Sequence, residues 1–152
     1  MKSLIVIFGF PGVGKTYIGE ILRDIYGYYL HDGDIDIPKD MKERIDHARP
    51  LTVDMRDEFF QKLLEHIQDL AAVHERLVVT QTFIKEKYRT KVKDAFPTAK
   101  FIYIEADEKI REHRLKKRTN YPLDIDYAKK MTGFFEKPKI KHDVIINNIS
   151  GT

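Results

Sequence analysis

The sequence predicts an α/β fold, in which an open parallel sheet of five strands is covered by helices on both faces. Three observations lead to this prediction. Short apolar runs alternate along the chain with longer segments of helical periodicity, which is the pattern of parallel strands joined by helices. The first run, residues 4–8 (LIVIF), has no polar residue, as expected of a strand buried on both faces. A glycine-rich segment follows it directly, and ligands of such sheets bind at the carboxyl ends of the strands.

The remaining elements follow the same alternation. The expected strands are residues 4–8, 28–31, 77–79, 101–104 and 144–146. The expected helices are residues 15–26, 53–72, 85–95, 108–118 and 125–135. The second of these helices carries the clearest apolar stripe, with aliphatic and aromatic residues at intervals of three and four. Gly27 fits the end of the first helix, and Pro97 follows the end of the third.

The composition fits a single domain over residues 1–152, because 42% of the residues are hydrophobic and no repeat or flexible linker divides the chain. The absence of cysteine excludes disulfides, thiolate catalysis and cysteine-bound metals. No apolar stretch reaches the roughly 18 residues that a membrane helix needs. The first residues do not fit a secretory signal, so we expect a cytoplasmic protein with no membrane partner. The formal charge of +3 suits anionic ligands but is too small to indicate nucleic-acid binding.

The glycine-rich segment GFPGVGKT (residues 9–16) matches the phosphate-binding loop G-x-x-x-x-G-K-[ST], with a strand before it and a helix after it. Glycines let successive backbone N–H groups point at phosphate oxygens, and the helix dipole adds to that field. Lys15 would bridge the β- and γ-phosphates, and the Thr16 hydroxyl would ligate Mg²⁺. We therefore expect a P-loop NTPase three-layer sandwich that binds ATP and Mg²⁺, rather than a turn with a chance lysine. The expected nucleotide-binding residues of the loop are Gly9, Pro11, Gly12, Val13, Gly14, Lys15 and Thr16.

An Asp-Gly-Asp motif lies just past the second expected strand, beside the phosphate loop in a sheet of this kind. Asp32 would hold Mg²⁺, and Asp34 would orient a substrate hydroxyl or accept its proton during attack on the γ-phosphate. With Lys15, Asp34 is therefore an expected catalytic residue. The alternative is a turn with a helix cap, which the same residue types favour. The third strand ends in residues 80–82 (TQT) without the acid usual in P-loop ATPases and GTPases, which favours a kinase.

The histidines show no metal-ligand spacing, so no metal is expected besides the Mg²⁺ of the nucleotide. The six are His31, His47, His66, His74, His113 and His142. His31 adjoins Asp32, but we favour a structural hydrogen bond at the strand end over a role in the site. The aromatic residues expected in the core rather than as base-stacking platforms are Phe59, Phe60, Phe134 and Phe135.

These motifs resemble those of the gluconate kinases and their shikimate kinase relatives, which place Asp-Gly-Asp at this point. Further segments resemble the gluconate kinase family, so that the likeness covers most of the chain. They are residues 50–56 (PLTVDMR), 83–89 (FIKEKYR), 101–104 (FIYI), 114–118 (RLKKR) and 134–138 (FFEKP). The chain departs from the family close to where substrate would bind. There, residues 35–38 (IDIP) keep only the proline of a His-Pro pair, Met55 replaces an Asp, and residues 120–122 (NYP) replace a His-Phe pair.

The resemblance implies a nucleoside-monophosphate-kinase-like fold with a short lid at about residues 114–125, and it leaves a homodimer open. Arg56 would pair with a carboxylate of the substrate, the alternative being a solvated arginine. Arg111, Arg114 and Arg118 share one helix face that would lie over the phosphates, unless it is only a solvated basic face. Of these, Arg118 is expected to act in catalysis and Arg114 in nucleotide binding.

The sequence thus predicts an ATP-dependent phosphotransferase that moves the γ-phosphate to a hydroxyl of a small anionic metabolite, with a gluconate-like sugar acid favoured. Two other functions stay open. A polynucleotide 5′-hydroxyl kinase would use the same machinery, but the small net charge counts against a nucleic-acid partner. A non-catalytic, ATP-binding regulatory module would explain the substituted substrate-side motifs. The intact residues Lys15, Thr16, Asp32 and Asp34 count against that module.

Overall fold

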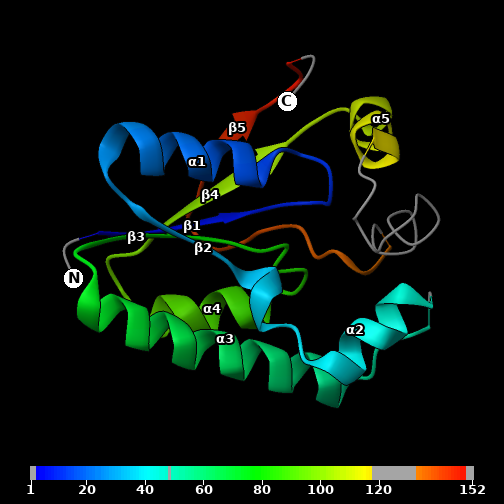
Figure 1. The fold of residues 1–152 in the computed structure, drawn as a ribbon, viewed down its shortest axis with the longest axis horizontal. Coiled ribbons are helices and arrows are strands. Elements are labelled where there is room, and N and C mark those ends of the chain that lie inside the picture. Colours follow the sequence, from blue (N-terminus) through cyan, green and yellow to red (C-terminus); the bar gives the residue numbers. More distant parts are fainter. Residues whose placement is uncertain (1–2, 48, 118–132, 150–152) are drawn as a thin grey trace.

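The computed structural model describes residues 3–47, 49–117 and 133–149. Within these residues, five strands form one parallel sheet in the order β2-β3-β1-β4-β5. The strands are β1 (Ser3–Phe8), β2 (Tyr29–Asp32), β3 (Arg76–Thr80), β4 (Lys100–Glu105) and β5 (Asp143–Ile146). Helix α1 covers one face of the sheet, and α3 and α4 cover the other, which gives three layers (Figure 1). The expected three-layer α/β fold is confirmed.

The helices begin and end where local chemistry favours it. They are α1 (Lys15–Tyr26), the 3₁₀ helix η1 (Gly33–Asp36), α2 (Lys39–Asp46), α3 (Val53–Val73), α4 (Glu86–Ala95) and α5 (Glu108–Lys117). Thr52 caps α3, because its hydroxyl accepts a hydrogen bond from the backbone N–H of Met55 at 3.1 Å. Gly27 ends α1 in a left-handed conformation with a φ of 73°, as its place in the sequence predicted.

Two apolar cores lie on the two faces of the sheet, because alternate strand residues point to opposite sides. On the α3 side, Leu4, Val6 and Phe8 of β1 pack with residues of α3 and α4. On the α1 side, Ile5 and Ile7 of the same strand pack with residues of α1. Both faces of β1 are therefore buried, as the unbroken apolar run predicted.

The strand order decides which loops meet at the carboxyl edge of the sheet. The phosphate loop follows β1 and the Asp-Gly-Asp motif follows β2, but β3 lies between these two strands. The residues that follow β3 therefore stand between the two motifs. The backbone N–H of Gln81 donates to the carbonyl of Ile7 at 3.1 Å, which ties this position to the end of β1.

Several expectations differ from the structure or lie outside it. Helix α2 was not expected, since its sequence KDMKERID is mostly charged and buries only Met41 and Ile45, one turn apart. Arg118, and all of the expected helix 125–135 before residue 133, lie outside the described residues. Phe134 is 51% exposed, so its expected place in the core is wrong, whereas Phe59 and Phe60 are buried. No helix of the described chain is long and apolar enough to cross a membrane.

Candidate active site

The phosphate loop connects the end of β1 to the start of α1, and its glycines are fixed by close neighbours. Gly12 has a φ of 83°, and a Cβ atom there would lie 2.8 Å from the carbonyl oxygen of Arg111. Gly14 has a φ of 94°, and a Cβ atom there would collide with the side-chain amide of Asn147. Because both the dihedrals and the space exclude a side chain, these positions require glycine.

Lys15 and Thr16 lie in the first turn of α1, where backbone N–H groups have no partner within the helix. The Lys15 ammonium donates to the carbonyls of Gly9 and Phe10 at 2.9 and 3.0 Å. It is thus held within the loop, at the positive end of the helix dipole. The Thr16 side chain is exposed. This arrangement gathers a cation, backbone donors and a hydroxyl, which is the chemistry that a polyphosphate needs.

Arg114 of α5 and Asn147, which follows β5, hold the phosphate loop through hydrogen bonds to its carbonyls. The guanidinium of Arg114 is buried and donates to the carbonyls of Gly12, Asn147 and Ile149 at 3.0, 2.9 and 3.0 Å. The Asn147 amide donates to the carbonyl of Val13 at 3.0 Å. Arg114 was expected to bind nucleotide, and in the structure it contacts the backbone of the phosphate loop. Asn147 follows β5, and no sequence motif pointed to it.

Arg111 lies one turn before Arg114 and contacts the loop differently. Its guanidinium lies over the Phe10 ring, 4.7 Å from the centroid. Its Nε is buried and has no hydrogen-bond partner within the part of the chain that the structure describes. Arg111 and Arg114 therefore share a helix face that turns toward the phosphate loop, in agreement with their spacing, and this face is packed rather than solvated.

The Asp-Gly-Asp motif spans the last residue of β2 and the first two residues of η1. Asp32 accepts a hydrogen bond from the backbone N–H of Asp34 at 2.9 Å. The helix cap, which was the alternative to a functional role for this motif, is therefore present. Asp34 is exposed, and its Oδ1 accepts a hydrogen bond from Gln81 Nε2 at 2.9 Å. Gln81 therefore orients Asp34 from the end of β3, where the sequence showed only a missing acid.

Strand alternation places Asp32 on the face of the sheet that α1, the helix of Thr16, covers. Asp32 pairs with Thr80 of β3, and paired residues of parallel strands point to the same side. Thr80 lies under Gly19 of α1, since a Cβ on Gly19 would approach its methyl group at 3.3 Å. Asp32 therefore faces the α1 layer, whereas His31 faces the α3 layer. His31 bonds to Asp36 at 2.7 Å, which confirms the structural hydrogen bond expected for it.

Arg56, expected to pair with a substrate carboxylate, lies near the start of α3. Its guanidinium stacks over the Phe134 ring at 5.4 Å, and its Nε is buried without a hydrogen-bond partner among the described residues. Nearby, the Tyr88 hydroxyl donates to Asp57 at 2.8 Å. Burial raises the pKa of Tyr88, and this hydrogen bond raises it further. Arg56 is thus a half-buried cation beside a neutral phenol, rather than a freely solvated side chain.

A fully buried arginine fixes the segment that carries Phe134. Arg89 donates to the carbonyls of Phe83 and Glu136, both at 2.8 Å, and to the Glu86 carboxylate at 3.0 Å. Its guanidinium lies 4.9 Å from the centroid of the Phe135 ring. Burial lowers the pKa of Arg89, and the Glu86 carboxylate opposes this effect. Segment 83–89, singled out by family likeness, thus anchors residues 134–136 to the core.

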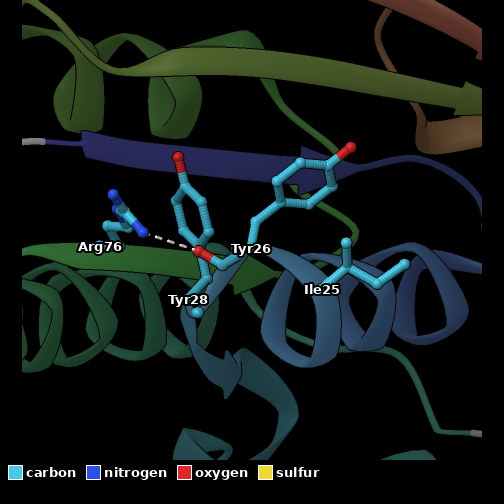
Figure 2. Close-up of a pocket in the computed structure, with 5 residues that line it drawn as sticks. Ile25, Tyr26, Tyr28 and Arg76 are labelled. Atoms are coloured by element: carbon cyan, nitrogen blue, oxygen red, sulfur yellow. Dashed lines mark hydrogen bonds between the residues drawn. The ribbon is translucent and has the colours of Figure 1, made fainter.

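A separate shallow hollow of about 600 Å³ lies far from these residues, between the end of α1 and the start of β3 (Figure 2). Its lining includes Ile25, Tyr26, Tyr28 and Arg76. Arg76 donates to the carbonyl of Tyr26 at 3.0 Å, which satisfies this cation within the wall of the hollow. The hollow therefore has no part in the site at the carboxyl edge.

Known proteins resemble the chain over most of its length. A family model described as an AAA domain matches residues 5–137. A shikimate kinase from Alkaliphilus oremlandii is 31% identical over 139 residues, which cover 90% of this chain and 79% of that protein. The thermoresistant gluconokinase of Escherichia coli is 26% identical over 117 residues, which cover 76% of this chain and 66% of that protein.

A solved structure supports the fold independently. A sugar kinase from Janibacter sp. matches with a TM-score of 0.84, covering 97% of this chain and 86% of its own, at 19% identity. The P-loop kinase fold is therefore shared beyond recognisable sequence similarity. Together, the family model, the two relatives and the geometry of the loop place the chain in the AAA-domain family, among the P-loop small-molecule kinases that include gluconokinases and shikimate kinases.

Proposed function

We propose that this chain transfers the γ-phosphate of ATP to a hydroxyl of a small anionic metabolite, with a gluconate-like sugar acid as the favoured acceptor. Membership of the family makes the chain a small-molecule kinase. The proposal adds the acceptor class and the role of each residue. It extends to a cytoplasmic location and, from the resemblance alone, to a homodimer.

The nucleotide side would be formed by the phosphate loop and the first turn of α1. The backbone N–H groups of the loop would bind the phosphates, and Lys15 would exchange its carbonyl partners for the β- and γ-phosphate oxygens. Thr16 and Asp32 fit Mg²⁺, because both offer oxygen ligands on the α1 face of the sheet. Bound there, Mg²⁺ would neutralise phosphate charge.

The acceptor side would depend on Asp34 and Arg56. Asp34, oriented by Gln81, would hold the acceptor hydroxyl and take its proton during in-line transfer. Arg56 would pair with the carboxylate of the acceptor, because its guanidinium is pre-positioned on Phe134 and its buried Nε has no partner among the described residues. Arg118 would close over the phosphates, and Arg114 would act on nucleotide binding through the Gly12 backbone.

One observation carries the proposal: a carboxylate that is both exposed and oriented by a neighbouring amide stands at the same sheet edge as the phosphate loop. A mere turn and cap would use Asp32 alone and would not need the Gln81 contact. The two relatives are named gluconokinase and shikimate kinase, which are kinases of small molecules. They favour neither a polynucleotide kinase nor a regulatory module.

ADP release tests the proposal. The protein is incubated with Mg-ATP and, separately, sugar acids, polyols, shikimate, nucleosides and an oligonucleotide with a 5′-hydroxyl. We expect turnover with one anionic small molecule, and a fall of about 10²-fold in Asp34→Asn. Turnover with the oligonucleotide alone would replace the acceptor class. ATP binding without turnover on any acceptor would favour the regulatory module.

A further inference from the structure

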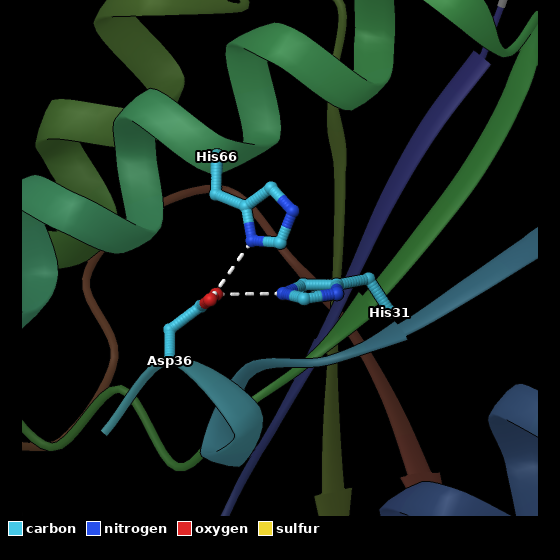
Figure 3. A group of neighbouring side chains, drawn as sticks. All are labelled: His31, Asp36 and His66. Carbon is cyan, nitrogen blue, oxygen red and sulfur yellow. Dashed lines mark hydrogen bonds and ion pairs between the residues drawn. The ribbon is translucent and has the colours of Figure 1, made fainter. Parts of the chain in front are cut away.

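Three side chains distant in the sequence converge behind the Asp-Gly-Asp motif. His31 comes from the end of β2, Asp36 from the last position of η1, and His66 from the middle of α3 (Figure 3). His31 Nε2 lies 2.7 Å from one carboxylate oxygen of Asp36, and His66 Nδ1 lies 2.8 Å from the other. The two imidazole rings meet edge to face at 4.4 Å between centroids.

The position of this triad within the fold calls for an explanation. His31 points into the α3 layer, level with Val79 of β3, and its side chain is 5% exposed. The side chain of Asp36 is 14% exposed. Burying a carboxylate and an imidazole among apolar residues costs desolvation free energy, and well-packed apolar side chains often stabilise a fold as well or better. Packing alone therefore gives no reason for these residue types.

Their chemistry matches a transition-metal site. One candidate ligand atom from each of the three residues can be chosen so that all three atoms lie within 4.8 Å of one another. In a tetrahedral zinc site with bonds of about 2.0–2.1 Å, neighbouring ligand atoms are about 3.3 Å apart. Small side-chain movements would therefore bring the three residues around one ion. Two imidazoles and one carboxylate suit Zn²⁺ and its neighbours, whereas Mg²⁺ prefers oxygen ligands.

We propose that His31, Asp36 and His66 bind one Zn²⁺-class ion, which fixes η1 to α3. The His66 side chain is 40% exposed, so solvent can reach the site and supply a fourth ligand. On binding, each ring moves its proton from the nitrogen that now faces Asp36 to its other ring nitrogen, and the freed lone pair bonds to the ion. Two hydrogen bonds are thereby replaced by bonds to the metal.

The ion would act on the segment that carries the carboxylates of the proposed phosphate transfer. Asp36 ends the 3₁₀ helix that contains Asp34, and Asp32 caps that helix. Fixing Asp36 to β2 and α3 would restrict how far Asp34 can move. This consequence rests on the proposed function, but metal binding itself does not. The site is also distinct from the Mg²⁺ site, because His31 and Asp32 face opposite layers of the sheet.

Calorimetric titration of the chelator-treated protein with ZnCl₂, without nucleotide, tests the site. We expect saturable binding of one ion per chain, and a rise in Tm of about 5–10 °C at 100 times the Kd. Co²⁺ should give the visible absorption of a tetrahedral site. His66→Gln should weaken Zn²⁺ binding by at least about 100-fold, because even outer-shell partners change metal affinity by 10- to 100-fold. Asp36→Asn should do the same.

Two control variants separate this site from other ligands. His113→Gln removes an exposed histidine of α5, and Asp32→Asn removes the proposed Mg²⁺ ligand; both should keep the wild-type affinity for Zn²⁺. Absence of saturable binding to the wild type, or binding that survives both His66→Gln and Asp36→Asn, would overturn the proposal. Neither result depends on kinase turnover, so the outcome is independent of the acceptor panel with Mg-ATP.

Discussion

The nucleotide side and the acceptor side of this site are built in different ways. On the proposed nucleotide side, the binding groups are loop N–H groups and the side chains of Lys15 and Thr16, all from one contiguous segment. Arg114 and Asn147 hold this segment through hydrogen bonds to loop carbonyls. On the proposed acceptor side, the groups are side chains from separate segments, such as Arg56 stacked on Phe134 and Asp34 held by Gln81.

This difference explains where the chain keeps the family motifs and where it departs from them. Backbone recognition of a triphosphate depends on dihedrals and space, which Gly12 and Gly14 supply and no other residue could. Side-chain recognition depends on the shape and charge of one acceptor, so it can be changed residue by residue. The substitutions in the substrate-side motifs are therefore compatible with a retained site for an anionic acceptor.

The largest effect is expected from a substitution on the proposed nucleotide side. Lys15→Met removes the ammonium that neutralises charge on the transferred phosphoryl group, and kcat should fall by about 10³-fold. Single-turnover ADP formation measures this loss, and thermal unfolding checks the fold. Because the Lys15 ammonium donates to carbonyls of the phosphate loop and the residue lies outside the two apolar cores, we expect the sheet to stay intact. A kcat within tenfold of the wild type would contradict the role of Lys15.

The second-largest effect is expected from a substitution of Asp34 on the proposed acceptor side. Asp34→Asn keeps an oxygen for the Gln81 hydrogen bond but removes the base, so kcat should fall by about 10²-fold. Fluorescent ATP-analogue binding should remain within about twofold of the wild type, because Asp34 would act on the acceptor alone. Gln81→Glu is a matched test, since it places a second carboxylate against Asp34. Weakened nucleotide binding in Asp34→Asn would mean that the two sides are not separable.

The third prediction concerns Arg114, whose hydrogen bonds connect α5 to the phosphate loop. Arg114→Ala leaves carbonyls of Gly12, Asn147 and Ile149 without their donor, and the free energy of unfolding should drop by about 3 kcal/mol. Urea denaturation measures this drop, and calorimetry should show weaker ATP binding. Arg111→Ala is the comparison variant and should cost less, because its Nε makes no hydrogen bond among the described residues. Equal losses of unfolding free energy in both variants would contradict a specific role of Arg114 in holding the phosphate loop.

The smallest effect is expected from a conservative substitution of Arg56 on the proposed acceptor side. Arg56→Lys keeps the charge but loses the planar donor pair, so KM for an anionic acceptor should rise by about tenfold while kcat changes little. Initial rates over a range of acceptor concentrations measure it. Phe134→Leu removes the stacking partner and should raise KM by less. Unchanged KM in Arg56→Lys would remove Arg56 from acceptor binding.

Prediction from sequence succeeded where chemistry is local. The five strands, the ends of α1 and the phosphate loop follow from apolar runs, glycines and one contiguous motif, and all three are present in the structure. Prediction failed for α2, whose charged sequence buries only Met41 and Ile45, and for Phe134, whose aromatic character does not reveal that it is exposed.

The fold class and the phosphate loop could be predicted from the sequence alone, because short-range periodicity and backbone dihedrals encode them. The kinase family was indicated by the resemblance of several motifs to those of known kinases. The side chains that contact the phosphate loop and the carboxylates could be identified only from the folded structure. Gln81 reaches Asp34 because β3 lies between β1 and β2, and Asn147 reaches Val13 because β5 ends beside the loop. His31 and His66 meet at Asp36 because α3 packs under the edge of the sheet. Strand order and helix packing, which join residues far apart in the chain, leave no periodic signal in the sequence.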